Sequence, residues 1–344
     1  MTDDQAGDPA GDPPPAPART ATRLRRGRCR GALGAAVAAM AILVGTVATP
    51  AEVGTATGAA PPTGGILLAL GDSLAAGYQP TDGRRLPPTS PSSGLPDQGY
   101  PGGYARAVAA AEHLHLVDLA CPGETTASFA GRPAQPACAT LYRAATGARS
   151  QLGAALAFLA THRGTVRLVT IDLGANDVVG CQSGSTVSLS CVRATTVRVR
   201  ARLDHDLARL AAALHADDPT ARLAGMTYYD PFLALAYQPG GLAGLAEAAF
   251  SLAAVATFDA ALTTVYRAHG AVVADVASAF DTGRSRPVET YRGVRLALDA
   301  AVVCRLTWMC PLPHHATPDI HPTTAGYARI AAAFVAALRR APAR

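Results

Sequence analysis

The sequence predicts an α/β protein of three layers, in which a central parallel sheet of about five strands lies between helices on both faces. Two observations lead to this prediction. Short apolar runs alternate along the chain with longer segments of helical spacing, which is typical of a parallel sheet covered by helices. The 344 residues are 49% hydrophobic and 16% charged, so the chain can form a sizeable core.

The first 64 residues are expected to serve export and to contribute nothing to the fold. Arginines in residues 19–30 precede the uncharged segment Gly31–Pro50, a pattern typical of a secretory signal. An uncleaved signal anchor is the alternative, since about 20 uncharged residues can span a bilayer. We therefore expect a secreted or extracytoplasmic protein, anchored in the membrane if residues 31–50 are retained, with a linker up to residue 64 and one domain at residues 65–344.

The elements of this domain follow in order from residue 65. Strand-like runs occur at Ile66–Leu70, Leu116–Ala120, Leu168–Leu173, Arg222–Thr227 and Ala271–Val276. Helical patterns occur at Tyr104–His113, Gln151–His162, Val197–His215, Ala246–His269 and Thr324–Arg339. The last helix has the clearest apolar spacing and follows a proline. Three remaining segments are expected to be loops around a site, namely Gln79–Gly103, Gly180–Arg193 and Asp281–Pro318.

The cysteines agree with an exported protein. Six cysteines remain outside the arginine-rich segment, and an even number in an exported chain indicates disulfides, although several pairings are possible. We expect the pairs that are local in sequence, which are Cys121–Cys138, Cys181–Cys191 and Cys304–Cys310. No C-x-x-C spacing occurs, so a zinc site is not expected.

Composition excludes several function classes. The chain contains no lysine, so all 30 basic residues are arginines, and phosphate-binding loops or Schiff bases that need a lysine are excluded. No basic stripe interleaved with aromatic residues indicates a nucleic-acid partner. We expect a monomer that acts on a small-molecule or lipid substrate without a metal or other cofactor.

Polar residues follow three of the predicted strands and precede the last helix. Gly71-Asp72-Ser73 ends the first strand, and Gly123 and Asn176 follow the second and third. His321 lies just before the last helix. Because ligands bind beyond the carboxyl ends of parallel strands, these residues are expected to meet at one edge of the sheet. Ser73 would be a nucleophile and His321 its general base, while the N–H groups of Ser73 and Gly123 and the amide of Asn176 would stabilise an oxyanion.

The set of four residues Ser73, Gly123, Asn176 and His321 resembles that of the SGNH hydrolases, the GDSL family of esterases and lipases. The four blocks read "GDSLAAGY", "LACPGETT", "LGAND" and "DIHPTTAGY", in the family's order over residues 66–339. The sequence "YYDPF" at residues 228–232 and the cysteine pairs further resemble the exported actinobacterial branch. The resemblance implies a flavodoxin-like sheet and hydrolysis of carboxylic esters through an acyl-enzyme. The α/β-hydrolase fold is excluded because its G-x-S-x-G elbow does not occur.

The chain departs from the family at the acid that orients the histidine. The family commonly has an acid three residues before the histidine, where this chain has Pro318, and Asp319 lies only two before it. Either the Asp319 carboxylate or a backbone carbonyl of Pro318 or Asp319 is expected to orient the imidazole.

Other functions on the same fold also remain open. A non-catalytic protein that binds cell-wall glycan or lipid is the alternative of another class. A carbohydrate O-deacetylase, a lysophospholipase or an acyltransferase are alternatives within the enzymes, because the loops decide the acceptor.

Overall fold

The computed structural model describes residues 64–80, 99–183, 186–237, 242–310 and 317–341, all within the unit Ala59–Arg344. The centre of this unit is a five-stranded parallel sheet of order β2-β1-β3-β6-β7. Its strands are β1 (Ile66–Gly71), β2 (His115–Asp118), β3 (Val166–Asp172), β6 (Arg222–Met226) and β7 (Val272–Ala274). The predicted fold class is confirmed. The expected export signal and most of the linker lie outside the described residues.

The strand order places a switch point at β1. The chain passes from β1 to β2 on one side and then to β3 on the other side of β1. Leu67 on β1 pairs with Leu116 on β2 and with Leu168 on β3, and all three side chains are buried. In sheets of this order the crevice at the carboxyl ends of the first and third strands is the usual ligand site.

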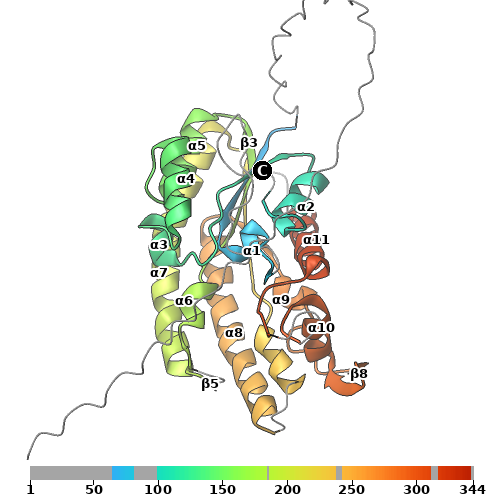
Figure 1. Cartoon of the computed structure of the whole chain (residues 1–344). Helices are drawn as coiled ribbons and strands as arrows, with labels where there is room; N and C mark the ends of the chain where they lie inside the picture. Colours follow the sequence, from blue (N-terminus) through green and yellow to red (C-terminus); the bar gives the residue numbers. More distant parts are fainter. Residues whose placement is uncertain (1–63, 81–98, 184–185, 238–241, 311–316, 342–344) are drawn as a thin grey trace, which may run out of the picture. The chain divides into compact units, whose positions relative to one another are not determined.

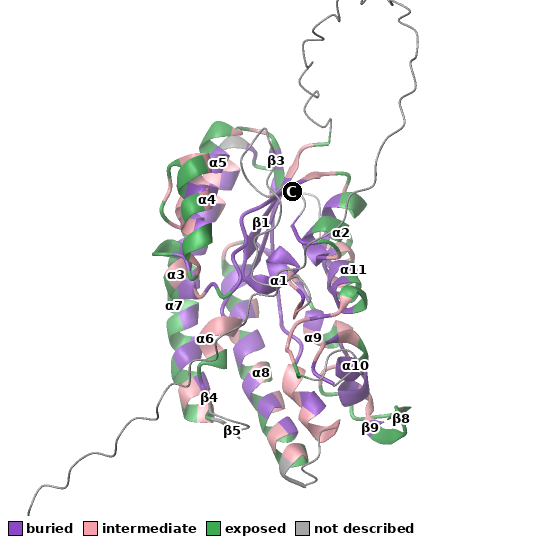
Figure 2. Cartoon of the chain, in the orientation of Figure 1, coloured by how far each residue is buried: buried purple, intermediate pink, exposed green. Residues whose placement is uncertain are grey.

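Helices cover both faces of the sheet (Figure 1). On one face α2 (Tyr104–Ala111) packs against α11 (Thr324–Arg340), and the rings of Tyr104 and Phe334 stack with centroids 4.9 Å apart. The other face is covered by α5 (Gln151–Thr161), α7 (Leu189–Asp217) and α8 (Leu242–Ala268), with α3 (Thr126–Ala130) and α4 (Pro136–Thr146) beside α5. Figure 2 shows the strands buried between these two layers.

Helix α8 is the most apolar of the long helices. By length and composition alone, Gly244–Ala268 could cross a membrane. Its side chains Phe258, Leu262 and Tyr266 are nevertheless buried in the main core, and it packs against α7 and β6. We therefore describe α8 as a core helix of this domain.

Two of the segments expected to be loops contain regular structure, so that expectation was wrong in part. Residues 180–193 include the hairpin β4 (Gln182–Ser183) and β5 (Thr186–Val187), and α7 begins at Leu189 because Ser188 caps it. Residues 281–318 include the hairpin β8 (Val288–Tyr291) and β9 (Val294–Ala297), followed by α10 (Leu298–Leu306). Helix α10 forms a second apolar cluster with η2 (Pro231–Tyr237). Most of the third segment, residues 81–98, lies outside the described residues.

The cysteines are paired as expected from their positions in the sequence. Disulfides join Cys121 to Cys138, Cys181 to Cys191 and Cys304 to Cys310, with Cα separations of 6.2, 5.5 and 5.0 Å. The first ties the loop after β2 to α4, the second fastens the β4–β5 hairpin to the start of α7, and the third brackets the segment after α10. Each closes a loop at the edge of the sheet where the polar strand ends lie.

Candidate active site

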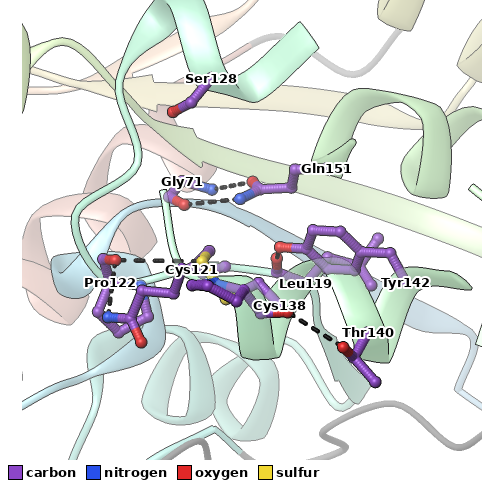
Figure 3. The surroundings of a disulfide bond; sticks show 12 residues. Gly71, Leu119, Cys121, Pro122, Ser128, Cys138, Thr140, Tyr142 and Gln151 are labelled. Carbon is purple, nitrogen blue, oxygen red and sulfur yellow. Dashed lines mark hydrogen bonds between the residues drawn. A yellow bond between two sulfur atoms is a disulfide. The ribbon is translucent and has the colours of Figure 1, made fainter. Parts of the chain in front are cut away.

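The end of β1 is shaped by a glycine that no other residue could replace without strain. Gly71 has φ +137°, and a Cβ there would lie 2.1 Å from Oδ1 of Asp172. Gln151, buried at the start of α5, accepts from the Gly71 N–H at 2.7 Å and donates to its carbonyl at 2.9 Å (Figure 3). The sequence did not mark Gln151 as part of the site. Its paired hydrogen bonds fix the backbone two residues before Ser73.

Ser73 opens the short helix α1 (Ser73–Ala76) directly after this turn. Asp72 caps the helix, because its Oδ1 accepts from the N–H of Leu74 at 2.9 Å. The N–H of Asp72 in turn donates to Oδ1 of Asp172 at 3.0 Å. Ser73 is 8% exposed, so its hydroxyl is held at the edge of the sheet and remains reachable.

The structure brings Ser73, His321 and Asp319 together in a line. Nε2 of His321 lies 2.8 Å from Oγ of Ser73, and Nδ1 lies 2.6 Å from Oδ1 of Asp319. The same Asp319 oxygen accepts from the His321 backbone N–H at 2.9 Å. This local turn brings a carboxylate only two residues away back to the ring, so the structure places the side chain, and not a carbonyl, at Nδ1.

The segment that carries His321 is held by backbone contacts with the residues after α10. The Trp308 N–H donates to the His321 carbonyl, and the Asp319 N–H donates to the Trp308 carbonyl, both at 3.0 Å. A bridge pairs Thr307 with Pro322, and the hydroxyl of Tyr229 donates to the Ile320 carbonyl at 2.5 Å. The Cys304–Cys310 disulfide closes around this anchor. Apart from the contact of the Tyr229 hydroxyl, these are backbone contacts that leave no pattern of side chains in the sequence, so the sequence analysis missed them.

The expected oxyanion residues lie around the same groove as Ser73 and His321. Gly123 and Asn176 both line this groove, and Gly123 has φ +84°. Nδ2 of Asn176 donates to the Glu124 carbonyl at 3.0 Å and to Oδ2 of Asp72 at 3.1 Å. An oxyanion would therefore have to replace one of these two acceptors.

Asp177 ties the two oxyanion segments together. Its Oδ2 accepts from the Thr126 N–H and its Oδ1 from the Thr126 hydroxyl, both at 2.8 Å. Thr126 begins α3, directly after the Gly123 loop, and Asp177 follows Asn176 on α6 (Ala175–Val179). Asp177 is thus a positioning residue that sets the spacing between Gly123 and Asn176.

We expect Asp177→Ala to lower kcat by about 10- to 100-fold with little change in KM, because a displacement of the donors near 1 Å weakens stabilisation of the transition state more than substrate binding. Ester hydrolysis by the purified variants measures this. Thr126→Ser keeps both donors and should retain activity, whereas Thr126→Val loses the hydroxyl and should give an intermediate loss. Equal kcat in Asp177→Ala and the unmodified chain would contradict this role.

Four acids are buried beneath the site without a described cationic partner. They are Asp72, Asp118, Glu124 and Asp172, each at most 1% exposed. Burial raises the pKa of Asp118 to about 8, of Glu124 to about 7 and of Asp72 to about 6, and it also raises the pKa of Asp172. In the folded protein Asp118 therefore keeps its proton at neutral pH.

These raised pKa values predict that stability falls as pH rises. The unfolded chain loses the Asp118 proton near its ordinary pKa of 3.8, whereas the folded chain keeps it up to about 8. Between these values the folded state binds more protons, so the free energy of unfolding decreases by about 1.4 kcal/mol per pH unit for this group. Asp118→Asn, which carries no proton to lose, should flatten the fall of Tm between about pH 5 and about pH 8.

Thermal unfolding at several pH values measures this slope. Asp204→Asn, which replaces an exposed carboxylate on α7, is the matched control and should keep the slope of the unmodified chain. The same slope in Asp118→Asn would show that Asp118 is not the group responsible.

An apolar cavity opens beside Ser73, and Gly123 is not among the residues that line it. It lies between α6, η2 and α8, and these elements line it with the apolar side chains of Ala175, Val178, Val179, Pro231, Phe232, Ala254, Val255 and Phe258. The polar Ser251 in its wall donates to Asp230 at 2.6 Å. Trp308 is not among the residues that line it. Among the described residues, no group of three His, Cys, Asp or Glu could hold a metal ion.

Comparison with known proteins decides the family. The model of the GDSL-like lipase/acylhydrolase family matches residues 69–329, a range that contains Ser73, Gly123, Asn176 and His321. The chain belongs to this family. No curated protein matches the chain.

Solved structures of a lipase, a phospholipase and an esterase resemble the chain at low identity. An extracellular lipase from Streptomyces rimosus is 22% identical, with TM-score 0.45 and coverage of 79% of this chain and 99% of the lipase. Phospholipase A1 from Streptomyces albidoflavus is 18% identical, with TM-score 0.47 and coverage of 80% and 99%. An acetyl-xylooligosaccharide esterase from Geobacillus stearmophilus is 14% identical, with TM-score 0.41 and coverage of 82% and 97%. Identities of this size leave the substrate of the present chain open.

Proposed function

We propose that the protein is an exported serine esterase or lipase that hydrolyses carboxylic esters through an acyl-enzyme. The observation that carries the proposal is the 2.8 Å contact between Oγ of Ser73 and Nε2 of His321, with Asp319 at the other ring nitrogen. A hydroxyl, a base and a group that orients the base are the parts that nucleophilic ester cleavage needs.

The first half-reaction forms the acyl-enzyme. Oγ of Ser73 bonds to the ester carbonyl carbon while its proton passes to Nε2 of His321, and the carbonyl oxygen becomes an oxyanion. The N–H groups of Ser73 and Gly123 and the amide of Asn176 would stabilise this charge, with the oxyanion replacing one of the present acceptors of that amide. The bond to the alcohol then breaks, and His321 returns the proton to the leaving oxygen. Asp319 holds the ring and stabilises its charged form.

The second half-reaction repeats these steps with water. His321 takes a proton from the water as its oxygen attacks the acyl carbon, and the proton returns to Ser73 as the acid leaves. Transfer to another alcohol would use the same geometry, since the groove beside Gly123 is open to solvent.

Export is part of the same proposal. Three disulfides, each joining a helix to a loop, suit an oxidising compartment, and the expected signal in residues 31–50 would direct the chain there. The resemblance of the sequence to exported actinobacterial members supports this assignment.

The cavity beside Ser73 predicts preference for an acyl chain longer than acetyl. We expect kcat/KM for p-nitrophenyl esters to rise from acetate to a chain of medium length, because each buried CH₂ contributes about 0.8 kcal/mol. Val255→Trp, which fills the cavity from α8, should shift the preference to acetate. Turnover of an ester series measures both effects.

Thr257→Trp is the matched control, because Thr257 is exposed on the same helix and does not line the cavity. A preference for acetate in the unmodified enzyme, unchanged by Val255→Trp, would contradict the acyl-chain assignment and favour an O-deacetylase. Absence of turnover with every ester would instead favour a non-catalytic binding protein.

A further inference from the structure

Tyr78 ends the sequence block GDSLAAGY, and the chemistry proposed above gives it no part. Its ring lies edge-to-face with the imidazole of His321, with the ring centroids 4.8 Å apart and the planes at 72°. Aromatic rings at this separation prefer such an arrangement. The half-buried Tyr78 side chain also lines the groove that reaches Ser73 and Gly123. The ring therefore contacts the candidate base directly, in the groove beside the candidate nucleophile.

The backbone fixes Tyr78 next to Ser73. Gly77 ends α1 with φ +80°, and a Cβ there would lie 2.4 Å from Cα of Gly103. This left-handed glycine turns the chain, and the Tyr78 N–H then donates to the Ser73 carbonyl at 2.9 Å. The hydroxyl of Tyr327 on α11 donates to the Tyr78 carbonyl at 2.5 Å. One short helix thus carries both the nucleophile and, just past its end, a ring that contacts the base.

A further aromatic ring supports Tyr78. Tyr100 packs edge-to-face on it, with the centroids 5.9 Å apart. Tyr100 is itself buried, and its N–H donates to the Ala76 carbonyl of α1 at 2.9 Å. The three rings of Tyr100, Tyr78 and His321 therefore pack in a row that begins in the buried part of the fold, and packing of this kind holds a functional side chain in one rotamer.

The polar contacts of the imidazole leave one motion free. Asp319 lies at Nδ1 of His321 and Ser73 at Nε2, and two such contacts allow the ring to tilt about the line that joins them. In the acyl-enzyme the Ser73 oxygen is bonded to the acyl carbon and has no proton to donate. The contact with Tyr78 does not change during this step, so it can hold the ring when the contact with Ser73 is weakened.

We infer that Tyr78 is a positioning residue, whose ring keeps Nε2 of His321 in place, above all while water attacks the acyl-enzyme. The inference rests on the proposed function and adds a residue to its site. A base that is misplaced by about 1 Å slows proton transfer by about 100-fold. Because the alcohol has already left when water attacks, any contact of Tyr78 with the alcohol half cannot affect this second step.

Rapid-mixing kinetics with p-nitrophenyl butyrate separate the two steps, because the burst of p-nitrophenol reports acylation and the following steady rate reports deacylation. We expect Tyr78→Leu to slow deacylation by about 10- to 100-fold and acylation by less. Tyr78→Met fills a similar volume without a ring and should behave in the same way. Tyr78→Phe keeps the ring and should keep both rates within about threefold.

Tyr237→Leu is the matched control. Tyr237 packs edge-to-face on Tyr291, with the centroids 5.4 Å apart, and lines neither the groove at Ser73 nor the apolar cavity. This variant loses an aromatic contact of the same kind and should keep both rates. Thermal unfolding of all the variants checks that they are folded.

The outcomes separate this inference from the proposal on which it rests. Unchanged deacylation in Tyr78→Leu and Tyr78→Met would overturn the positioning role, even if KM rises because a wall of the groove is lost. A loss in Tyr78→Phe equal to that in Tyr78→Leu would also overturn it, because the hydroxyl and not the ring would then be responsible. Both results leave the esterase proposal standing, whereas absence of any turnover by the unmodified enzyme would remove that proposal itself.

Discussion

Ser73→Ala should lower kcat/KM for a p-nitrophenyl ester by about 10⁵-fold or more while the protein remains folded. Oγ of Ser73 is the atom that would attack the carbonyl carbon. Among the described contacts, no other hydroxyl lies at Nε2 of His321 to replace it. Alanine should fit this site, because α1 is capped by Asp72 and not by the serine hydroxyl. Kinetics and thermal unfolding of the same preparation test both halves of this expectation.

His321→Ala should be about as damaging as Ser73→Ala, since nucleophile and base act as one unit. The double variant should then be little worse than either single one. His269→Ala, which removes a histidine paired with Asp204 on the α7–α8 side of the fold, is the control and should keep its activity. Losses that multiply in the double variant would show that the two residues act independently.

Asp319→Asn has the second largest expected effect. The carboxylate lies 2.6 Å from Nδ1 of His321, so it fixes the tautomer that leaves Nε2 free to accept the Ser73 proton. The asparagine amide has the size of the carboxylate and can still accept from the His321 backbone N–H. It presents a donor or a neutral acceptor to the ring in place of a charged acceptor. We expect kcat to fall by about 10²- to 10⁴-fold with little change in Tm.

The size of this loss also decides between the two ways of orienting the histidine. A fall of less than about 10-fold would indicate that a backbone carbonyl can hold the ring, as the position of Pro318 first suggested. Asp281→Asn is the matched control, because Asp281 pairs with Arg284 far along the chain from His321. It should leave kcat unchanged.

The sheet and its ligand edge could be predicted from the sequence because their signal is local. Apolar runs such as Leu67–Leu70 are buried in the sheet, and a parallel sheet covered by helices brings the ends of its strands to one edge. Three short sequence blocks at those strand ends and a fourth before the last helix then suffice to place Ser73 and His321 near one another.

The other features of the fold and the candidate site depend on contacts between segments far apart in the sequence. Gln151 reads as an ordinary polar residue at a helix start, yet its amide is buried against Gly71, 80 residues away. The segment before α10 reads as a loop because only Tyr291 and Leu296 pack on the cluster of η2 and α10, whereas Val288 and Val294 are exposed. Asp177 reads as a helix cap, whereas its carboxylate holds Thr126.

The spacing in the sequence could not by itself decide whether the Asp319 carboxylate contacts the His321 ring. Asp319 lies two positions before His321, and in an extended chain the two side chains would lie on the same face without being drawn into contact. The backbone N–H of His321 draws the carboxylate into a turn at 2.9 Å, and this turn brings the same oxygen to Nδ1. Local hydrogen bonds of this kind depend on backbone angles that the sequence pattern does not specify.

Covalent labelling with a fluorophosphonate tests most directly whether Ser73 is a nucleophile activated by His321. The reagent bonds to a serine whose proton is removed by a neighbouring base, and peptide mass spectrometry locates the adduct. The structure predicts one phosphonylated serine, at Ser73, with labelling lost in His321→Ala and strongly slowed in Asp319→Asn. A folded protein that stays unlabelled, or that carries the adduct at another residue, would contradict it.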